Sequence, residues 1–287
     1  MHALSPFRVL GMLPLAMAVA PSAGQTIIPR GNLPPAAVAA PAYADIADLV
    51  TGAPMVIDAT VRDTTRIRGA EAASVAQGYQ RLYVTVDVVA LIRAPAGAPA
   101  RLGYVYDVPL DAAGRIPKLR KARVLLFARP VAGRIDQIQL VEPDAQIGWT
   151  PPAEAMTRAI AAAFAAPDAA PRVTGIGNAF HTPGTLPGEG ETQIFLTTTG
   201  GPVSIGIQRR QDQPPTWAVA LNEIVDQALP PPARDTFLWY RLACGGLPAA
   251  LPDAIMAGDD PANAAIARED YRLVRRALGP CRTGTAG

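Results

Sequence analysis

Histidine, cysteine, serine and lysine are all rare in this chain, and each shortage narrows the chemistry that the protein can perform. Among its 287 residues are only two histidines, His2 and His181, and two cysteines, Cys244 and Cys281. Histidine is the usual acid–base group near neutral pH, so an active site built on several histidines is excluded. The cysteines do not form a C-x-x-C pair, which argues against redox catalysis.

Long hydrophobic runs and an excess of one charge are also missing. A helix that crosses a bilayer needs about 20 apolar residues, and no stretch of this length occurs, so we expect no membrane span. The formal net charge is +2 at pH 7, which is too small for a global field that would steer the protein toward anionic partners. Composition alone therefore gives no reason to expect a nucleic-acid partner.

The amino terminus has the pattern of a cleaved export signal. Arg8 supplies a positive charge, residues 9–20 form an apolar run, and small residues follow at 21–24. This order is typical of a secretory signal peptide. Ser22 and Gly24 suit the −3 and −1 positions, so cleavage after Gly24 would leave residues 1–24 as the signal and a periplasmic or secreted mature protein.

The rest of the chain divides into a lead-in and two candidate domains. Residues 25–42 are rich in proline and alanine and predict a linker. At roughly 100–200 residues per domain, the remainder predicts two domains. A proline-bounded segment at 167–171 separates residues 43–166 from residues 172–287.

The first candidate domain has the periodicity of a small β-barrel or sandwich. A short helix is expected at 43–50, and Thr150 and Pro151 open a second helix that ends near Ala166. A hairpin-type turn is expected at 111–114. The predicted strands are 55–65, 82–91, 102–108, 124–128 and 135–141.

The second candidate domain is again mostly β and closes with a helix. Asp260 caps a predicted helix over 261–278, and Gly279-Pro280 ends it. The predicted strands are 172–179, 192–198, 203–209, 217–225 and 236–243. The fold class is therefore mainly β (α+β): two small β-barrel or sandwich domains with a linking helix and a C-terminal helix.

The two cysteines predict a disulfide. An even cysteine count in an exported chain favours a bridge. A Cys244–Cys281 bond would close a loop of about 36 residues, worth roughly 3–4 kcal/mol. Two buried free thiols are the alternative.

The strand order of the first domain resembles the oligonucleotide/oligosaccharide-binding (OB) type barrel of netrin and metalloproteinase-inhibitor modules. The resemblance is carried by the order of five elements and covers about 100 residues: a short helix, the strand around Val56–Val61, LYVTVDVVALIRAP, RLGYVYDV and RVLLFARP. Those modules are usually stapled by cysteines, whereas this chain has none before Cys244, so an inhibitory cysteine wedge is not implied. The phrases GEGETQIFLTT, WAVALNEIVD and TFLWYRLAC also resemble uncharacterised exported proteins of sphingomonad-type bacteria, which implies a compartment and no activity.

The segment around His181 is the main candidate for catalysis. His181, Glu189 and Glu191 offer metal-ligand types, and a serine triad would join His181 to Ser74 or Ser204. The spacing fits no metal motif, and Ser204 is not in a G-x-S-x-G elbow. We therefore assign no catalytic residue, metal site or cofactor, and we keep a hydrolase or metal-dependent enzyme using the His181 loop as the alternative function.

A basic segment is the candidate binding surface. It holds five cations within nine residues and no acid: Arg115, Lys118, Arg120, Lys121 and Arg123. With the tyrosines at 79, 83, 104 and 106 it could form a cationic, aromatic face of the kind that binds single-stranded nucleic acid or anionic glycans. The alternative is an edge strand protected by charge.

Together these features predict an exported periplasmic binding or scaffolding protein without catalytic activity. Its expected partner is an unknown protein or an anionic envelope polymer, because nucleic acid is not expected outside the cytoplasm.

Overall fold

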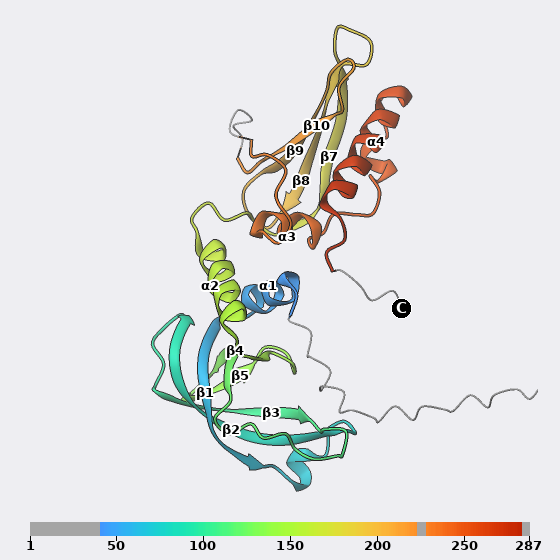
Figure 1. Cartoon of the computed structure of the whole chain (residues 1–287). Helices are drawn as coiled ribbons and strands as arrows, with labels where there is room; N and C mark the ends of the chain where they lie inside the picture. Colours follow the sequence, from blue (N-terminus) through green and yellow to red (C-terminus); the bar gives the residue numbers. More distant parts are fainter. Residues whose placement is uncertain (1–40, 223–227, 283–287) are drawn as a thin grey trace, which may run out of the picture. The chain divides into compact units, whose positions relative to one another are not determined.

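The computed structural model describes residues 41–222 and 228–282 (Figure 1). The predicted signal peptide and nearly all of the predicted 25–42 linker lie outside these residues. Within the described part of the chain, no helix combines the length and the apolar character that a membrane crossing requires. The predicted fold class is confirmed: the chain forms a small barrel and a second sheet, with helices packed around them.

The element bounds agree closely with the sequence periodicity over most of the chain. The first half contains α1 (Tyr43–Gly52), β1 (Met55–Arg66), η1 (Gly69–Ala72), β2 (Tyr79–Arg93), β3 (Arg101–Pro109), β4 (Arg123–Val131), β5 (Arg134–Leu140), β6 (Gln146–Gly148) and α2 (Pro151–Ala165). The second half contains β7 (Val173–Pro183), β8 (Gly190–Thr198), β9 (Val203–Arg209), β10 (Thr216–Ala220), α3 (Phe237–Ala243), η3 (Asp253–Met256) and α4 (Pro261–Leu278).

Five strands of the first half close into a barrel. Their order is β1-β2-β3-β5-β4, and β4 pairs back onto β1, with β6 added beside β4. The 12-residue strand β1 serves both neighbours because it bends, and its register against β2 shifts at three places. Such bulges let one strand turn a barrel corner. Only the junction of β3 with β5 is short, since the two strands share a single parallel pair, Gly103–Gln137.

The barrel interior follows the predicted alternation. Leu82, Val84 and Val86 on β2 are buried, whereas Val88 is half-buried. Residues 124–128 of β4 are buried without interruption, and this strand pairs with three others, β1, β5 and β6. The barrel therefore has its own hydrophobic core.

The predicted hairpin at 111–114 is wrong in its pairing, although the turn itself is present. Asp111 holds the turn by accepting bonds from the Ala113 and Arg115 main-chain N–H groups, both at 2.9 Å. The strands on either side are not neighbours, because β3 lies next to β5 while β4 pairs with β1 and β5. A turn signal specifies the local backbone, but the pairing is decided by closure of the barrel.

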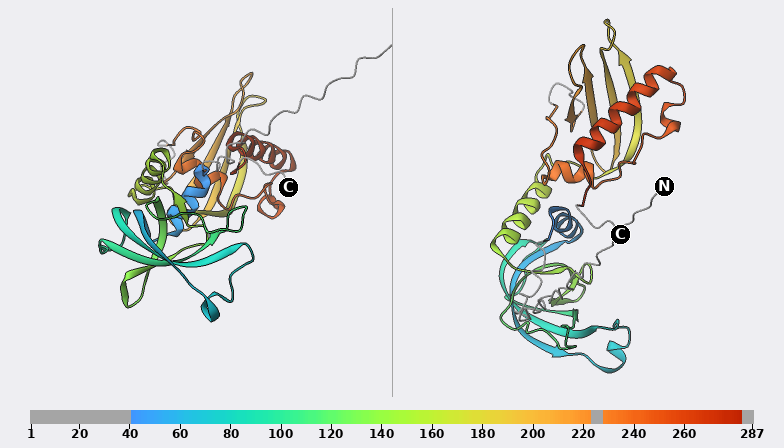
Figure 2. Two further views of the ribbon diagram at one scale, coloured as in Figure 1. Left: turned by 60° about the horizontal axis from the view of Figure 1, so that its bottom comes forward. Right: turned by 45° about the vertical axis from the view of Figure 1, so that its right-hand side comes forward.

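The second sheet is antiparallel, in the order β10-β9-β8-β7, and α4 packs against β7 and β8 on one of its faces (Figure 2). Ile194, Ile205 and Ile207 are fully buried on this face. Asp260 caps α4 as predicted, because its carboxylate accepts from the N–H groups of Ala262 (2.9 Å) and Asn263 (3.2 Å).

Two strand predictions of the second half fail. Residues 236–243 were expected to form a strand but form helix α3, in which the side chain of Thr236 accepts from the Trp239 N–H. The predicted strand 217–225 is β10 only as far as Ala220, and its last three residues lie outside the described range. The aromatic residues of TFLWYRLA favour a strand by composition. The segment is a helix because Thr236 caps its start and because most of the helix surface is buried.

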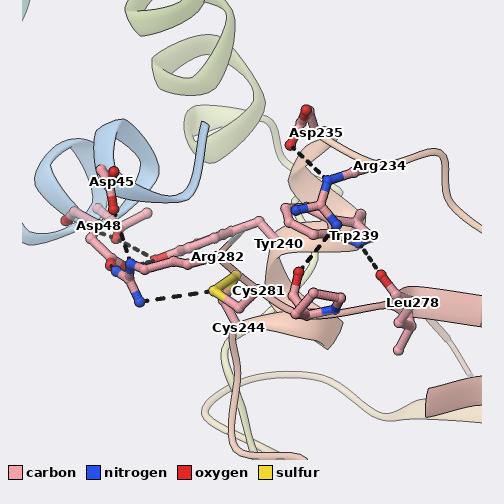
Figure 3. The surroundings of a disulfide bond; sticks show 12 residues. Asp45, Asp48, Arg234, Asp235, Trp239, Tyr240, Cys244, Leu278, Cys281 and Arg282 are labelled. Carbon is pink, nitrogen blue, oxygen red and sulfur yellow. Dashed lines mark hydrogen bonds and ion pairs between the residues drawn. A yellow bond between two sulfur atoms is a disulfide. The ribbon is translucent and has the colours of Figure 1, made fainter. Parts of the chain in front are cut away.

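Cys244 and Cys281 form the predicted disulfide, with Cα atoms 4.9 Å apart (Figure 3). Cys244 follows α3 rather than a strand, so the bridge joins the ends of α3 and α4. The Trp239 indole N–H reinforces this junction by donating to the Leu278 carbonyl at 2.8 Å. Arg282, next to the bridge, forms ion pairs with Asp45 (2.9 Å) and Asp48 of α1, and Tyr240 also donates to Asp48 at 2.6 Å.

Candidate functional site

One cavity of the barrel lies where β3 and β5 diverge. It measures about 480 Å³. We name it the β3–β5 groove; the residues that matter for its chemistry are Tyr83, Gly103, Val105, Asp107, Arg129 and Gln137. Most of its lining residues lie on β2, β3, β4 and β5, and regular strands hold binding residues more precisely than loops do.

The register between β2 and β3 fixes the direction of the main-chain groups. Pairing is continuous and free of bulges from Tyr79–Pro109 to Asp87–Arg101. Just beyond its two ends, the Val88 N–H donates to the Ala100 carbonyl (2.9 Å) and the Leu110 N–H donates to the Gly78 carbonyl (2.8 Å). Antiparallel pairs alternate between hydrogen-bonded and non-hydrogen-bonded, so the even-numbered residues of β3 bond to β2.

The odd-numbered residues of β3 consequently direct their N–H and C=O groups away from β2. Gly103 uses this edge to pair with Gln137, and within residues 41–222 and 228–282 no further β3–β5 pair follows. The main-chain groups of Val105 and Asp107 therefore face the groove beyond the end of the ladder. Pro109, which has no N–H, ends this edge.

A tyrosine on β2 explains why a glycine stands where the ladder ends. The hydroxyl-bearing end of Tyr83 lies across the outer side of Gly103, and an ideal Cβ placed on Gly103 would lie 2.0 Å from the Tyr83 hydroxyl oxygen. Val105, directly opposite Tyr83 on β3, is 49% exposed. Tyr83 and Val105 therefore form an apolar wall on the outer side of the groove.

An ion pair stabilises the far end of this wall. Arg81 donates through Nε and Nη2 to the two carboxylate oxygens of Asp107, each at 2.8 Å. The hydrogen bonds from Arg81 lower the pKa of Asp107, so this carboxylate stays ionised at neutral pH. The Arg81 and Asp107 charges compensate each other, and the remaining charged side chains that line the groove are Arg129 and Glu142, one of each sign.

The four tyrosines do not form the single aromatic face that the sequence suggested. Tyr104 points into the barrel, is 1% exposed and donates to Gln146 at 2.5 Å, and burial raises its pKa. Tyr106 is half-buried, and burial raises its pKa as well. Tyr79 and Tyr83 occupy odd positions of β2, on the opposite side of the strand from its buried even positions.

The five cations of the basic segment do not act as one group either. Arg115 forms an ion pair with Asp111 at 3.0 Å, and Arg123 forms one with the fully buried Asp58 at 2.5 Å. Three exposed cations remain without an ion pair in the described part of the chain, namely Lys118, Arg120 and Lys121. They lie on a loop that precedes β4, so the alternative prediction of an edge strand is wrong for these residues.

Arg123 is a structural residue. Its guanidinium lies 3.8 Å from the centroid of the Trp149 ring and 3.6 Å from a carboxylate oxygen of Glu154, in addition to its bond with Asp58. These contacts join β4 to β1 and to the start of α2. Hydrogen bonding to Asp58 raises the pKa of Arg123, which therefore remains charged.

His181 belongs to β7 rather than to a loop, and it joins a buried polar network beneath α4. The hydroxyl of Thr192 donates to Asp270 (2.5 Å) and therefore accepts from Nδ1 of His181 (2.9 Å). Arg209 donates to the same Asp270 carboxylate through Nε at 2.9 Å. This chain of bonds fixes the proton of the neutral imidazole on Nδ1 and leaves Nε2 as an acceptor.

Burial and the nearby Arg209 lower the pKa of His181, and Asp270 opposes them only in part. The imidazole is therefore neutral at neutral pH. It lines a cavity of about 290 Å³ together with Glu189, Arg209 and Ile266.

The other residues proposed to work with His181 lie elsewhere. Cross-strand pairs share a sheet face, so His181 lies with its partner Thr192 on the face toward α4. Glu191 and Ser204, each one residue away from positions on that face, point to the opposite side. Within the described residues, no group of three or more histidine, cysteine, aspartate or glutamate side chains is arranged to hold a metal ion.

Sequence reasoning missed the β3–β5 groove because the groove depends on which strands do not pair. The outward alternation of Tyr83 and the lone glycine of RLGYVYDV were visible signals. Neither indicates that β3 lies next to β5, a neighbour more than 30 positions away along the chain.

Comparison with known proteins identifies no relative of this chain. No known protein-family model matches it, and no curated protein sequence is significantly similar to it.

Proposed function

We propose that this protein is exported to the periplasm and acts there as a non-catalytic binding or scaffolding protein, with the β3–β5 groove as its binding site. The observation that carries the proposal is an open strand edge within a cavity of about 480 Å³ on the barrel. The disulfide between the ends of α3 and α4 supports an oxidising compartment.

The arrangement of polar groups supports binding rather than catalysis. Acid–base catalysis needs titratable groups that converge on one reacting atom. In the groove, Arg81 and Asp107 already satisfy each other, and Tyr104 is bonded to Gln146. These groups give the groove a fixed shape and a fixed polarity, which suits recognition.

Site-specific photocrosslinking in the producing cells tests the proposal. A photoreactive phenylalanine analogue at position 105 lies in the groove, and the same analogue at position 89 is a matched control, because Val89 is similarly exposed (53% against 49%) but does not line the groove. We expect an envelope adduct from position 105 and none from position 89. Equal labelling from both positions, or none from position 105, would contradict the assignment of the groove.

The exported form is tested separately by intact mass. Protein recovered from the periplasm should begin at or near Gln25. A periplasmic mass that includes residues 1–24, or retention of the chain in the cytoplasm, would contradict the export proposal whatever the crosslinking shows.

The loop with Lys118, Arg120 and Lys121 is a second candidate surface. Its three exposed cations, without ion-pair partners among the described residues, favour an anionic envelope polymer as its ligand. Binding there would be electrostatic and sensitive to salt, which separates it experimentally from binding in the groove.

A further inference from the structure

We infer that the β3–β5 groove binds an extended peptide, which adds to the edge of β3 as an extra strand beside Val105 and Asp107. This inference rests on the proposed function and specifies the chemistry of its ligand. It follows from the direction of main-chain groups, from the limits of the free edge and from the charge balance of the groove.

The free edge offers the alternating pattern that only another main chain matches. Val105 and Asp107 are two residues apart, and both direct N–H and C=O away from β2. Successive donor–acceptor sets on one edge are about 6.8 Å apart, twice the rise of one residue in a strand. An extended peptide repeats donors and acceptors at this spacing, whereas a glycan does not.

The edge has defined ends, which sets the length of the added strand. At one end Gly103 is already paired with Gln137, and the Tyr83 side chain lies across it. At the other end Pro109 has no N–H to offer. Between these limits β3 can accept about two pairs of main-chain bonds, which corresponds to a recognised segment of roughly five residues.

The side chains around the edge indicate a neutral, partly apolar segment. The outward-facing wall is formed by Val105 and the Tyr83 ring, so a β-branched or aromatic residue next to Val105 would cover exposed apolar surface. Arg81 is neutralised by Asp107, and Arg129 is balanced by Glu142 among the groove residues. The ligand therefore needs no net charge, in contrast to a ligand of the basic loop.

The experiment selects binders from a random nonapeptide phage library on the immobilised, oxidised full-length mature chain. Enriched peptides are then titrated against the wild type, Val105→Pro and Val105→Ala. Proline removes the Val105 N–H, which faces the groove and not β2, so the β2–β3 ladder remains intact. We expect Val105→Pro to weaken binding about tenfold or more, the effect of losing a hydrogen bond and the strand geometry. Val105→Ala keeps the N–H and should change the affinity only about twofold.

Amide hydrogen exchange on the wild type provides a readout that does not depend on the proline variant folding. A bound peptide should protect the Val105 and Asp107 amides. The Tyr104 and Tyr106 amides, already bonded to β2, should change little. Binding should also vary less than about threefold between 0.05 and 0.5 M salt, because no net charge is involved.

The outcomes separate failure of this inference from failure of the proposed function. If position 105 crosslinks to envelope material but Val105→Pro and Val105→Ala bind peptides equally, or the two amides stay unprotected, strand addition is wrong and groove binding stands. Heparin fragments provide a competing ligand of another chemical class. If they protect the Val105 and Asp107 amides and act at no other surface, the ligand is a polysaccharide and the inference is overturned. If no peptide is enriched over the Val105→Pro background, it is overturned as well.

Discussion

The hydroxyl of Tyr83 lies over the Cα of Gly103, so close that an added Cβ would lie 2.0 Å from it. This contact occurs at the single pair between β3 and β5, Gly103–Gln137. The barrel therefore opens into its groove directly beyond the contact between a tyrosine on β2 and a glycine on β3.

The first prediction tests this contact. Gly103→Ala should destabilise the wild type by about 1 kcal/mol because the Tyr83 side chain must move off the strand. In a Tyr83→Ala background the same change should stabilise the protein by about 0.5 kcal/mol, since glycine is unfavourable within a strand. Chemical denaturation of the four proteins measures the reversal. The same sign in both backgrounds would show that Tyr83 does not require a glycine at position 103.

The barrel strands were predictable because each has a strong local pattern. Leu82, Val84 and Val86 alternate with polar or amphipathic residues, and this alternation specifies both the strand and its buried side. The helix over 261–278 was equally clear, since Asp260 and Gly279 mark its two ends. In these elements the local signal and the tertiary environment agree.

The failures come from relations between distant residues. The Asp111 turn is present, but β3 and β4 do not pair because closure of the barrel places β5 between them. Residues 237–243 form a helix because they are buried by several neighbouring elements, an environment that strand propensity does not describe. The groove was missed for the same reason, since a free strand edge can be recognised only when the partners of every other strand are known.

The second prediction distinguishes the binding role proposed for the basic loop from the structural role of Arg123. The triple variant Lys118→Glu, Arg120→Glu, Lys121→Glu should lose retention on an anionic matrix at 0.1 M salt, while its melting temperature remains almost unchanged, because these side chains are exposed and have no ion pair among the described residues. Arg123→Gln is the contrasting variant. It leaves the fully buried Asp58 without its cation and should destabilise the fold by roughly 3 kcal/mol. A triple variant that is retained like the wild type would remove the loop as a binding surface.

The third prediction concerns the Cys244–Cys281 bridge. Reduction, or the double variant Cys244→Ala, Cys281→Ala, should destabilise the second half by roughly 3 kcal/mol, because the bridge constrains a loop of 37 residues in the unfolded chain. Thermal unfolding with and without reductant measures the change. The double variant is the control: its melting temperature should not respond to reductant. If both thiols of the unreduced, denatured wild type react with an alkylating reagent, the bridge is absent.

The fourth prediction concerns domain boundaries. The two sheets share no strand among the described residues, so we expect limited proteolysis to cut first within 25–42 or 167–171. Fragments 43–166 and 172–287 should each give a cooperative unfolding transition. Residues 172–287 should be less stable as a fragment than within the intact chain, because the fragment loses the bonds from Tyr240 and Arg282 to α1. If neither fragment folds, the boundary is wrong.

The last prediction follows from the buried network around His181. Burial lowers the pKa of this histidine in the folded protein below the value of about 6.5 of an unfolded chain. The folded state therefore binds fewer protons than the unfolded state as the pH falls past 6.5, and its stability must decrease in that direction. The imidazole network is bonded through Thr192 on β8, Arg209 on β9 and Asp270 on α4, and Glu189 lines the same cavity as the imidazole.

His181→Gln provides the comparison, because glutamine can hydrogen-bond to Thr192 but does not titrate. Above pH 7 both proteins should show only a weak dependence of unfolding free energy on pH. Between pH 6.5 and 5 the wild type should lose more stability than His181→Gln, and the difference between the two isolates the imidazole from the carboxylates that titrate in both. Denaturant unfolding at a series of pH values measures it. Parallel curves for the two proteins would show that His181 takes up its proton equally in the folded and unfolded states, and the imidazole would then have no influence on the acid stability of this sheet.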